Sequence, residues 1–400
     1  MKYIIFIIDG AADYPIEELD NKTPLQVAKK PNIDSLAKKG KCGLLETVPK
    51  EMPPDSAVAN MSILGYDLKK YYQGRGVLEA ANIGVKIGKD DVVFRCNVIC
   101  EENGKIKNHS GGHISTQEAH KLIEALDEKL GDNEIKFYPG VSYRNLLVLK
   151  GKKYSADVEC TPPHDVPGTE VSRVLVRAKN EKGKETANLL NKLILDSKAI
   201  LEKHPVNNKR MKEGKDMANM IWPWSPGKKP AMKTFQELYK IKGAAISAVD
   251  LINGLGRYAG FDVINVEGAT GLWNTNYEGK ADACINALKN HDLVFVHVEA
   301  ADEASHEGDL KLKIRCIEDF DKRLLGRVLV NLKEEVSVAI LPDHLTPVKV
   351  RTHVHGAVPF LIYRQNGEGD GVKEFNEVSC KNGSYGLLKG NEFIRDFFKR

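Results

Sequence analysis

The sequence contains no long apolar run and no paired-cysteine motif. Its first apolar segment, residues 3–8, is far shorter than the roughly 18 residues that a membrane-spanning helix needs, and no other run comes closer. The seven cysteines are odd in number and include no CxxC pair, which indicates reduced thiols instead of a disulfide framework. Because we also find no secretion signal or lipid anchor, we expect a globular, cytoplasmic protein without a membrane partner.

Neither sign of charge is in large excess. The 59 Lys and Arg residues against 55 Asp and Glu leave a net charge of +4 over 400 residues, and no basic block is dense enough to follow a nucleic-acid backbone. Glycine-rich phosphate signatures are also missing, because there is no GxxxxGKS/T loop and residues 74–76 do not form a dinucleotide fingerprint after a strand. We therefore expect no nucleic-acid partner and find no sign of an obligatory protein partner.

The apolar residues that are present indicate a large α/β protein. With 42% hydrophobic residues, a chain of 400 residues exceeds what one core usually serves, which favours two domains or one domain with an insertion. Three apolar runs, at residues 3–8, 293–300 and 336–341, are typical of strands buried on both faces of a parallel sheet. Helical patterns follow the first run and separate the other two. These segments predict a doubly wound α/β fold.

Between the first and second of these runs the pattern changes. From about residue 90, strand patterns alternate with single helices, and residues 181–214 have the pattern of one long amphipathic helix. After the sequence WPWSPGKKP, which we interpret as a loop, the earlier pattern returns. We therefore predict an inserted α+β domain at residues 88–225. The remaining residues, 1–87 and 226–400, would form one discontinuous core domain.

An acidic residue follows each of the three buried strands, namely Asp9, Asp302 and Asp343. Open α/β sheets bind ligands at the carboxyl ends of their strands. Four histidines lie near these acids in the sequence: His306, His344, His353 and His355. Carboxylates mixed with imidazoles suit Mn²⁺, Zn²⁺ or Co²⁺ better than Ca²⁺, and so many ligands predict two ions. The spacing leaves His353 and His355 as alternatives, and we interpret His297 and Glu299 as structural.

Ser56 stands where a proline-rich loop, Pro53-Pro54-Asp55, enters a helical pattern. A serine at such a place is commonly an N-cap that binds helix amides. Alternatively it is a nucleophile, because a metal ion on its oxygen would lower the pKa of the hydroxyl and the helix amides would stabilise an attacked phosphoryl group. The residues alone leave both interpretations open.

Several segments are similar to one protein family. They occur in the family's order along almost the whole chain: IIDGAADYPI, DSAVANMSILGYDLKKYYQGRGVLEAANIGV, GGHIS, PGVSYRNLLV, TPPHD, NTNYEGKAD, ADEASHEGD, LPDHLTP and THVHGAVPF. This set resembles the archaeal-type cofactor-independent phosphoglycerate mutases of the alkaline phosphatase superfamily. The resemblance implies an alkaline-phosphatase-like core with an inserted cap domain that excludes water from the substrate.

The resemblance also implies two divalent metal ions, with Mn²⁺ the expected metal and Zn²⁺, Co²⁺ or Mg²⁺ as alternatives. One ion would be held by Asp302, His306 and His353. The other would be held by Asp9, Asp343, His344 and the oxygen of Ser56. On this mapping His353, not His355, is the ligand.

The activity implied is the interconversion of 3-phosphoglycerate and 2-phosphoglycerate. Ser56 would take the phosphoryl group as a phosphoserine and return it to the neighbouring hydroxyl, so that no bisphosphoglycerate cofactor is needed. The substrate contacts implied by position are His113, Arg144, His164 and Asp165 in the inserted domain and Lys280 in the core domain.

Two other activities remain open on the same scaffold. One is a homoserine-kinase-type phosphotransferase, and the other is a metal-dependent phosphatase. Relatives often carry an acid directly after the serine and another near the last histidine ligand, where this chain has Ala57 and Gly356-Ala357. These departures remove no ligand, but they bear on which substrate is bound.

Overall fold

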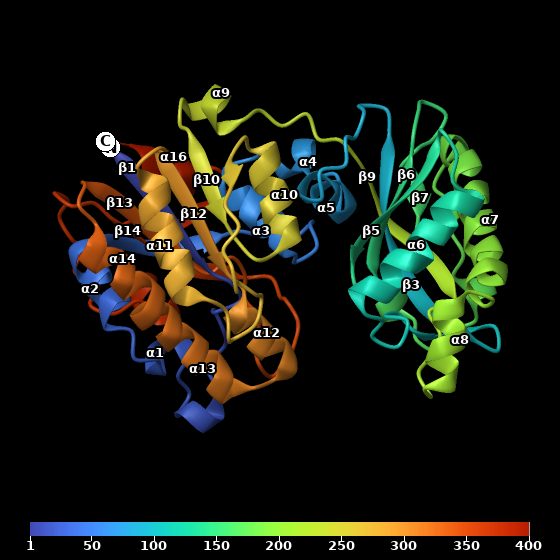
Figure 1. Cartoon of the computed structure of the whole chain (residues 1–400). Coiled ribbons are helices and arrows are strands. Elements are labelled where there is room, and N and C mark those ends of the chain that lie inside the picture. The colour runs from blue at the N-terminus through green and yellow to red at the C-terminus, as the bar shows by residue number, and fades with distance from the viewer. Residues whose placement is uncertain (400) are drawn as a thin grey trace. The chain divides into compact units, whose positions relative to one another are not determined.

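The computed structural model describes residues 1–399 and divides the chain into two compact units (Figure 1). The core unit contains residues Met1–Tyr72 and Met232–Arg400, and the inserted unit contains Gln73–Ala231. The inserted unit is longer than residues 88–225 because helix α5 (Arg75–Asn82) packs against strands of that unit. Among the described residues no helix is long and apolar enough to cross a membrane.

The core unit is built on one mixed sheet of eight strands in the order β11-β10-β12-β1-β13-β14-β2-β15. The strands are β1 (Lys2–Ile8), β2 (Lys41–Glu46), β10 (Gly243–Ile246), β11 (Asp262–Val263), β12 (Leu293–Val298), β13 (Val336–Leu341), β14 (Ala357–Tyr363) and β15 (Leu387–Lys389). The first five strands in this order pair in parallel, and β14 is antiparallel to both of its neighbours. The three apolar runs expected as buried strands are β1, β12 and β13, which lie side by side in the sheet.

Helices cover both faces of this sheet (Figure 1). On one face, Phe6 of β1 packs edge-on against Phe320, with ring centroids 5.9 Å apart. On the opposite face, the ring of Tyr3 lies 5.4 Å from that of Phe397. Because alternate residues of one strand point to opposite faces, a run that is buried at every position must be covered on both sides. The predicted α/β fold is therefore confirmed for the core unit.

The helical elements of the core unit lie between and after these strands. They are η1 (Glu17–Leu19), α1 (Pro24–Val27), α2 (Pro31–Lys39), α3 (Ser56–Ile63), α4 (Leu68–Tyr71), α9 (Phe235–Tyr239), α10 (Asp250–Tyr258), α11 (Tyr277–Leu288), α12 (Ala300–Glu307), α13 (Leu310–Asp319), the π-helical η5 (Phe320–Leu325), α14 (Gly326–Asn331), α15 (Glu377–Cys380) and α16 (Glu392–Phe398).

The inserted unit has its own antiparallel sheet and its own apolar core. Its strands are β3 (Val92–Glu102), β4 (Lys105–Asn108), β5 (Ile135–Val141), β6 (Arg144–Leu149), β9 (Met220–Lys228) and a separate pair, β7 (Val158–Glu159) with β8 (Arg177–Ala178). Besides α5, its helical elements are α6 (Thr116–Leu130), η2 (Pro163–Asp165), η3 (Val171–Arg173), η4 (Glu181–Gly183), α7 (Lys184–Leu201) and α8 (Pro205–Lys212). This content is α+β.

Two expectations for the inserted unit were wrong. The WPWSPGKKP segment is not a loop but most of β9, and Trp222 and Trp224 are buried in its core. The prolines are compatible with a strand because, among the described strands, β9 pairs with β3 alone, so its other edge needs no donors. The expected single helix at residues 181–214 is divided into α7 and α8, because Pro205 begins a new helix that His204 caps.

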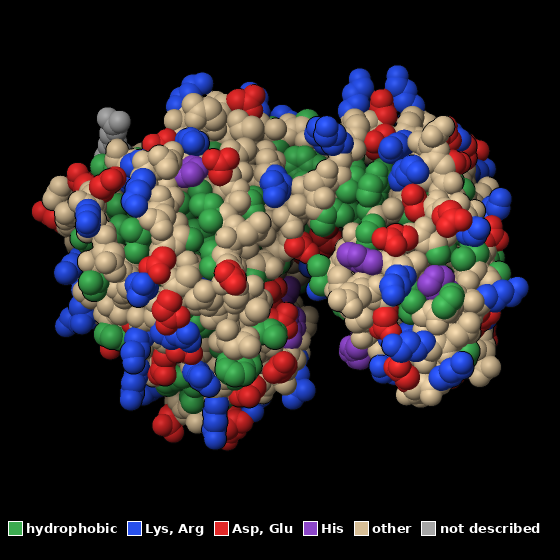
Figure 2. All heavy atoms as spheres, viewed as in Figure 1, with side chains coloured by type: hydrophobic (Ala, Val, Ile, Leu, Met, Phe, Trp, Pro, Cys, Tyr) green, Lys and Arg blue, Asp and Glu red, His purple; other side chains and the backbone are tan. Residues whose placement is uncertain are grey.

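Charged side chains of both signs are interspersed over the visible faces of both units (Figure 2). This distribution matches the net charge of +4 and shows no single-sign patch on that side.

Candidate metal centre

The candidate centre lies at the carboxyl ends of three neighbouring parallel strands of the core unit. Asp9 directly follows β1, Asp302 lies in α12 shortly after β12, and Asp343 follows β13 by two residues. Since β1 pairs in parallel with both β12 and β13, the three carboxylates are brought to one edge of the sheet. All three side chains are buried.

The acids and histidines form two groups that share His344. One group is Asp9, Asp343 and His344, and the other is Asp302, His344 and His353, with the ligand atoms of each group within 4.8 Å of one another. In the first group, His344 Nε2 lies 3.4 Å from Asp9 Oδ1 and 3.5 Å from Asp343 Oδ2. Each group therefore offers both oxygen and nitrogen donors to a single point.

His306 extends the second group. Its Nε2 lies 3.1 Å from Asp302 Oδ2 and 3.0 Å from Nε2 of His353. Its other ring nitrogen, Nδ1, lies 3.0 Å from the carbonyl oxygen of Arg351, which fixes the orientation of the ring. The hydrogen bond to Asp302 raises the pKa of His306 to about 9. A proton on this imidazole and a metal ion at the same atom exclude each other, so metal binding would release it.

The charges of this cluster fit divalent cations. Burial raises the pKa of Asp9 well above its usual range, and the carboxylates of Asp343 and Asp302 raise it further. The buried Oδ1 atom of Asp9 also has no hydrogen-bond partner among the described residues. Three buried carboxylates need compensating positive charge, and their oxygens with the surrounding imidazole nitrogens form a donor set typical of Mn²⁺ or Zn²⁺.

Ser56 begins α3 and faces this cluster. Its Oγ lies 3.1 Å from Nε2 of His344, the histidine that the two groups share. The N-cap of α3 is Asp55, whose Oδ1 accepts a hydrogen bond of 2.7 Å from the amide of Ala57. The interpretation of Ser56 as the N-cap is therefore wrong. Its hydroxyl does not cap α3 and instead lies against His344 of the cluster.

The structure separates the two alternative histidines. His353 Nε2 lies 3.4 Å from Asp302 Oδ2, and its Nδ1 lies 3.3 Å from the carbonyl oxygen of Pro54. His355 is exposed, and its Nε2 lies 2.8 Å from the carbonyl oxygen of Met52. The geometry therefore places His353 with the metal-ligand candidates and leaves His355 outside them.

Three residues around the cluster were not indicated by the sequence. The side-chain nitrogen of Asn60, Nδ2, donates hydrogen bonds of 2.8 Å both to the carbonyl oxygen of Ser56 and to Asp343 Oδ2. The hydroxyl of Thr346 donates a 2.6 Å hydrogen bond to Asp302 Oδ1 and lies 3.0 Å from Nδ1 of His344. The signal for Asn60 was its spacing, because it follows Ser56 by one helical turn.

Gly10 is the third of these residues. It has a φ of +63°, and a Cβ atom on it would lie 2.4 Å from Asp302 Oδ1. Glycine is required here for both reasons, because a side chain would strain the backbone and displace a ligand candidate. Its amide donates a 3.2 Å hydrogen bond to Asp343 Oδ1.

Two more titratable groups lie beneath the centre. His297 of β12 is fully buried, with Nε2 3.1 Å from Asp9 Oδ2, and burial lowers its pKa to about 4. Lys280 of α11 is also buried, and its ammonium donates a 3.1 Å hydrogen bond to the carbonyl oxygen of His297. Burial lowers the pKa of Lys280 to about 8. Lys280 is thus not the exposed helix residue that its type suggests.

The other predicted substrate contacts, His113, Arg144, His164 and Asp165, are all exposed residues of the inserted unit. The ring of His164 lies 5.3 Å from that of Trp224 and 5.9 Å from that of His109. His109 is 5.4 Å from Tyr143, and the Arg144 guanidinium lies over the same tyrosine.

Burial, followed by the charges of His164 and His113, lowers the pKa of His109. The predicted histidines and Arg144 therefore share one neighbourhood, to which His109 belongs although the sequence did not indicate it. Arg144 supplies a guanidinium there, and burial lowers the pKa of His164 as well as that of His109, which favours neutral imidazoles able to form hydrogen bonds.

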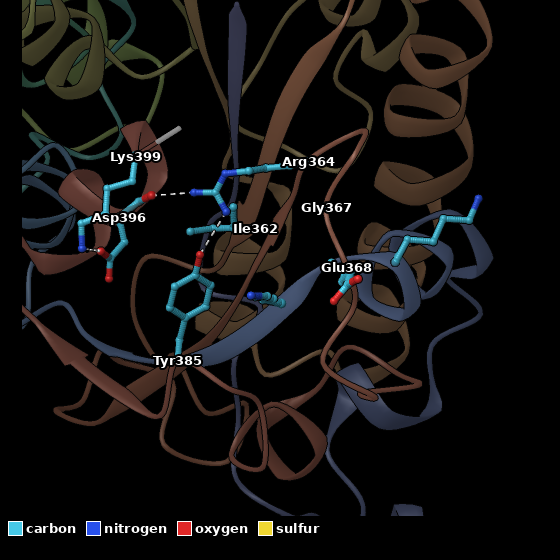
Figure 3. A pocket seen from close by; sticks show the side chains of 10 residues that line it. Ile362, Arg364, Gly367, Glu368, Tyr385, Asp396 and Lys399 are labelled. Carbon is cyan, nitrogen blue, oxygen red and sulfur yellow. Dashed lines mark hydrogen bonds and ion pairs between the residues drawn. The ribbon is translucent and has the colours of Figure 1, made fainter.

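A separate pocket of about 260 Å³ lies between β2, β14 and the C-terminal helix (Figure 3). The Arg364 guanidinium donates to the hydroxyl of Tyr385 at 3.1 Å and to the carbonyl oxygen of Asp396 at 2.6 Å, as the dashed lines show. Its lining contains none of the residues of the two donor groups. The pocket is therefore distinct from the candidate centre.

Comparisons with known proteins agree on one family. A family model described as 2,3-bisphosphoglycerate-independent phosphoglycerate mutase matches residues 37–207. A protein of that name from Methanosarcina acetivorans is 54% identical over 398 residues, which cover 98% of each chain. Another from Methanocaldococcus jannaschii is 38% identical over 397 residues, covering 98% of this chain and 96% of the relative.

Solved structures agree with these matches. A protein of Pyrococcus horikoshii has a TM-score of 0.85 at 32% identity, covering 99% of this chain and 96% of its own. A cofactor-independent phosphoglycerate mutase of Thermoplasma acidophilum has a TM-score of 0.70 at 29% identity, covering 99% of each chain. The predicted resemblance and the predicted fold class are both confirmed. The chain belongs to the family of 2,3-bisphosphoglycerate-independent phosphoglycerate mutases.

Proposed function

We propose that this protein interconverts 3-phosphoglycerate and 2-phosphoglycerate through a phosphoserine at Ser56. The observation that carries the proposal is the 3.1 Å separation between Ser56 Oγ and Nε2 of His344, the residue common to both donor groups. A hydroxyl at the start of a helix, next to a site built for two cations, is placed for attack on a phosphoryl group. Full-length similarity to named mutases supports this substrate.

The proposed centre holds two divalent ions, with Mn²⁺ as the metal. Asp302, His306 and His353 would hold one ion, and Asp9, Asp343, His344 and Ser56 Oγ would hold the other. When bound, such ions neutralise the charge of the phosphoryl group and lower the pKa of the serine hydroxyl. The hydrogen bonds of Asn60 and Thr346 orient Asp343, Asp302 and His344 for this role.

In the proposed reaction, a bond forms between Ser56 Oγ and phosphorus while the bond from phosphorus to the 3-oxygen of the substrate breaks. The serine loses its proton, and the leaving oxygen gains one. The glycerate then attacks the phosphoserine through its 2-oxygen, which regenerates the serine. No bisphosphoglycerate takes part, because the protein itself stores the phosphoryl group.

The substrate is a small polyanion and needs cationic and hydrogen-bonding partners. We propose His113, Arg144, His164 and Asp165 of the inserted unit for this role, with that unit acting as a cap. Their common neighbourhood around His109 supports the assignment for His113, Arg144 and His164. For Lys280 we propose a contribution of charge beneath the centre, because its ammonium is buried against the carbonyl of His297.

The proposal is tested by supplying the Mn²⁺-loaded protein with 3-phosphoglycerate and coupling product formation to enolase, without bisphosphoglycerate. A parallel reaction contains ATP and homoserine, and a third follows free phosphate. We expect product in the enolase-coupled reaction only. Product only with ATP and homoserine would assign the chain to a kinase activity, and release of phosphate alone would make it a phosphatase.

Removal of the metal gives a further expected result. Treatment with a chelator, followed by desalting, should abolish mutase activity, because the buried carboxylates lose the cations that make the centre attractive to an anion. Addition of Mn²⁺ should restore activity. As a control, the mutase reaction is quenched before enolase and its Mg²⁺ are added, so that the Mg²⁺ of the assay cannot reload the mutase. Full activity in the chelated and desalted protein would contradict the proposed centre.

A further inference from the structure

A buried ammonium lies behind the candidate centre and has no part in the chemistry proposed above. Lys313 of α13 is completely buried. Its Nζ donates hydrogen bonds to Asp13 Oδ2 at 2.8 Å, to the carbonyl oxygen of Thr346 at 3.0 Å and to the carbonyl oxygen of Ala12 at 3.4 Å. An ammonium without water is costly unless each donor finds an acceptor, and here three acceptors match three donors.

These acceptors belong to the two loops that carry metal-ligand candidates. Ala12 and Asp13 lie in the loop that starts at Asp9, after β1. Thr346 lies in the loop after β13, three residues beyond Asp343. The ammonium therefore joins two chain segments that are more than three hundred residues apart in the sequence.

Thr346 carries this connection to the ligands themselves. Its hydroxyl donates to Asp302 Oδ1 at 2.6 Å and lies 3.0 Å from Nδ1 of His344, so it contacts one residue of each proposed ion. Its amide donates to the carbonyl oxygen of Ala12 at 3.2 Å. Lys313 thus holds the backbone of the residue whose side chain orients Asp302 and His344.

The carboxylate of Asp13 completes the network. Its Oδ2 accepts from the amide of Val348 at 3.1 Å as well as from Lys313, and its Oδ1 accepts from the amide of Tyr14 at 2.7 Å. The amide of Asp13 donates at 3.1 Å to Glu377, which in turn accepts from the hydroxyl of Thr23. Lys313 is the positive group that faces Asp13 in this network, so loss of the ammonium would leave the buried Asp13 carboxylate without its counter-ion.

We propose that Lys313 is a positioning residue. Its buried ammonium fixes the loops after β1 and β13 and so keeps the metal-binding residues of both loops at the same distances from one another. The inference rests on the two-metal part of the proposed function. Groups that hold metal ligands from outside commonly contribute one to two orders of magnitude in metal affinity. Lys313→Met should therefore weaken Mn²⁺ binding about 10-fold, the lower end of this range, because Lys313 acts on the ligands only through the two loops.

A matched control separates positioning from general stabilisation. Lys30 is also buried, and its Nζ lies 3.1 Å from Asp34 Oδ1 in the first turn of α2; among the described residues its ammonium makes no hydrogen bond to either ligand loop. Both Lys313→Met and Lys30→Met should lower the melting temperature of the metal-free protein, because each leaves a carboxylate without its partner. Only the Lys313 variant should lose metal affinity.

The test titrates the metal-free, full-length proteins with Mn²⁺ and follows free Mn²⁺ by electron paramagnetic resonance. We expect Lys30→Met to bind within about twofold of the original protein, as substitutions remote from a site do. If Lys313→Met binds Mn²⁺ as tightly as Lys30→Met, the positioning role is wrong. Failure of the unchanged protein to bind two ions would instead contradict the proposed function.

A second variant keeps the inference testable if Lys313→Met does not fold. Thr346→Val preserves the shape of the side chain and the backbone carbonyl, but removes the hydroxyl that contacts Asp302 and His344. This variant should weaken Mn²⁺ binding about 10-fold. Unchanged affinity would contradict the claim that Thr346 links Lys313 to Asp302 and His344. Where both single variants fold, the double variant should lose less affinity than the product of the two single losses, because the residues act through one contact.

Discussion

Ser56→Ala lowers the turnover of 3-phosphoglycerate by at least about a thousandfold, because the variant has no oxygen to accept the phosphoryl group. The enolase-coupled assay measures this loss as a fall in kcat. Mn²⁺ binding should change little, since Ser56 supplies only one of the proposed ligands and the carboxylates and imidazoles remain. A separate Mn²⁺ titration of the metal-free variant checks that the centre is intact.

Ser62→Ala is the matched control for this variant. Ser62 lies on the same helix, is buried, and is not among the residues of either donor group. We expect its kcat to stay within about threefold of the original value, as for a substitution with no role in the chemistry. Turnover of Ser56→Ala near the original rate would show that the phosphoserine mechanism is wrong.

His344→Ala is the second substitution with a large expected effect. Because His344 is a proposed ligand of the ion that lies next to Ser56, its loss should weaken Mn²⁺ binding at that position and lower kcat by at least about a thousandfold. It also removes the partner of Ser56 Oγ. The measurements are the number of Mn²⁺ ions bound per chain and the initial rate in the coupled assay.

His355→Ala supplies the comparison from the same segment of the chain. His355 is exposed and belongs to neither donor group, and its Nε2 lies 2.8 Å from the carbonyl oxygen of Met52, so its removal should preserve both metal stoichiometry and rate. Comparison of the two alanine variants separates the loss of a proposed ligand from the loss of an exposed histidine nearby in the chain. Two tightly bound ions in His344→Ala would contradict the assignment of this residue as a metal ligand.

The central strands of the fold could be predicted from the sequence because their burial is complete. Runs such as residues 3–8 are apolar at every position, which a surface strand or an amphipathic helix is not. Strand β9 could not be predicted in this way. Its prolines and Ser225-Pro226-Gly227 are typical of loops, and the strand accommodates them with a positive φ at Ser225, where the pairing with β3 shifts register.

The candidate ligands could be predicted because each of the three acids follows a buried strand, whereas the residues that hold them could not. Asp9, Asp302 and Asp343 follow buried strands, and parallel pairing is enough to bring them together. Lys313, by contrast, lies in a charged helical sequence, where a lysine normally faces solvent. Its burial depends on acceptors from two distant loops, which no local pattern contains.

The most direct measurement of the central claim is the detection of the phosphoserine itself. The Mn²⁺-loaded protein, in excess over 3-phosphoglycerate labelled with ³²P, is quenched in acid during the first turnover and digested for mass spectrometry. The proposed mechanism predicts an acid-stable label on the peptide that contains Ser56, and no label on that peptide from Ser56→Ala. Conversion to 2-phosphoglycerate with no label on Ser56, or with the label on another residue, would contradict it.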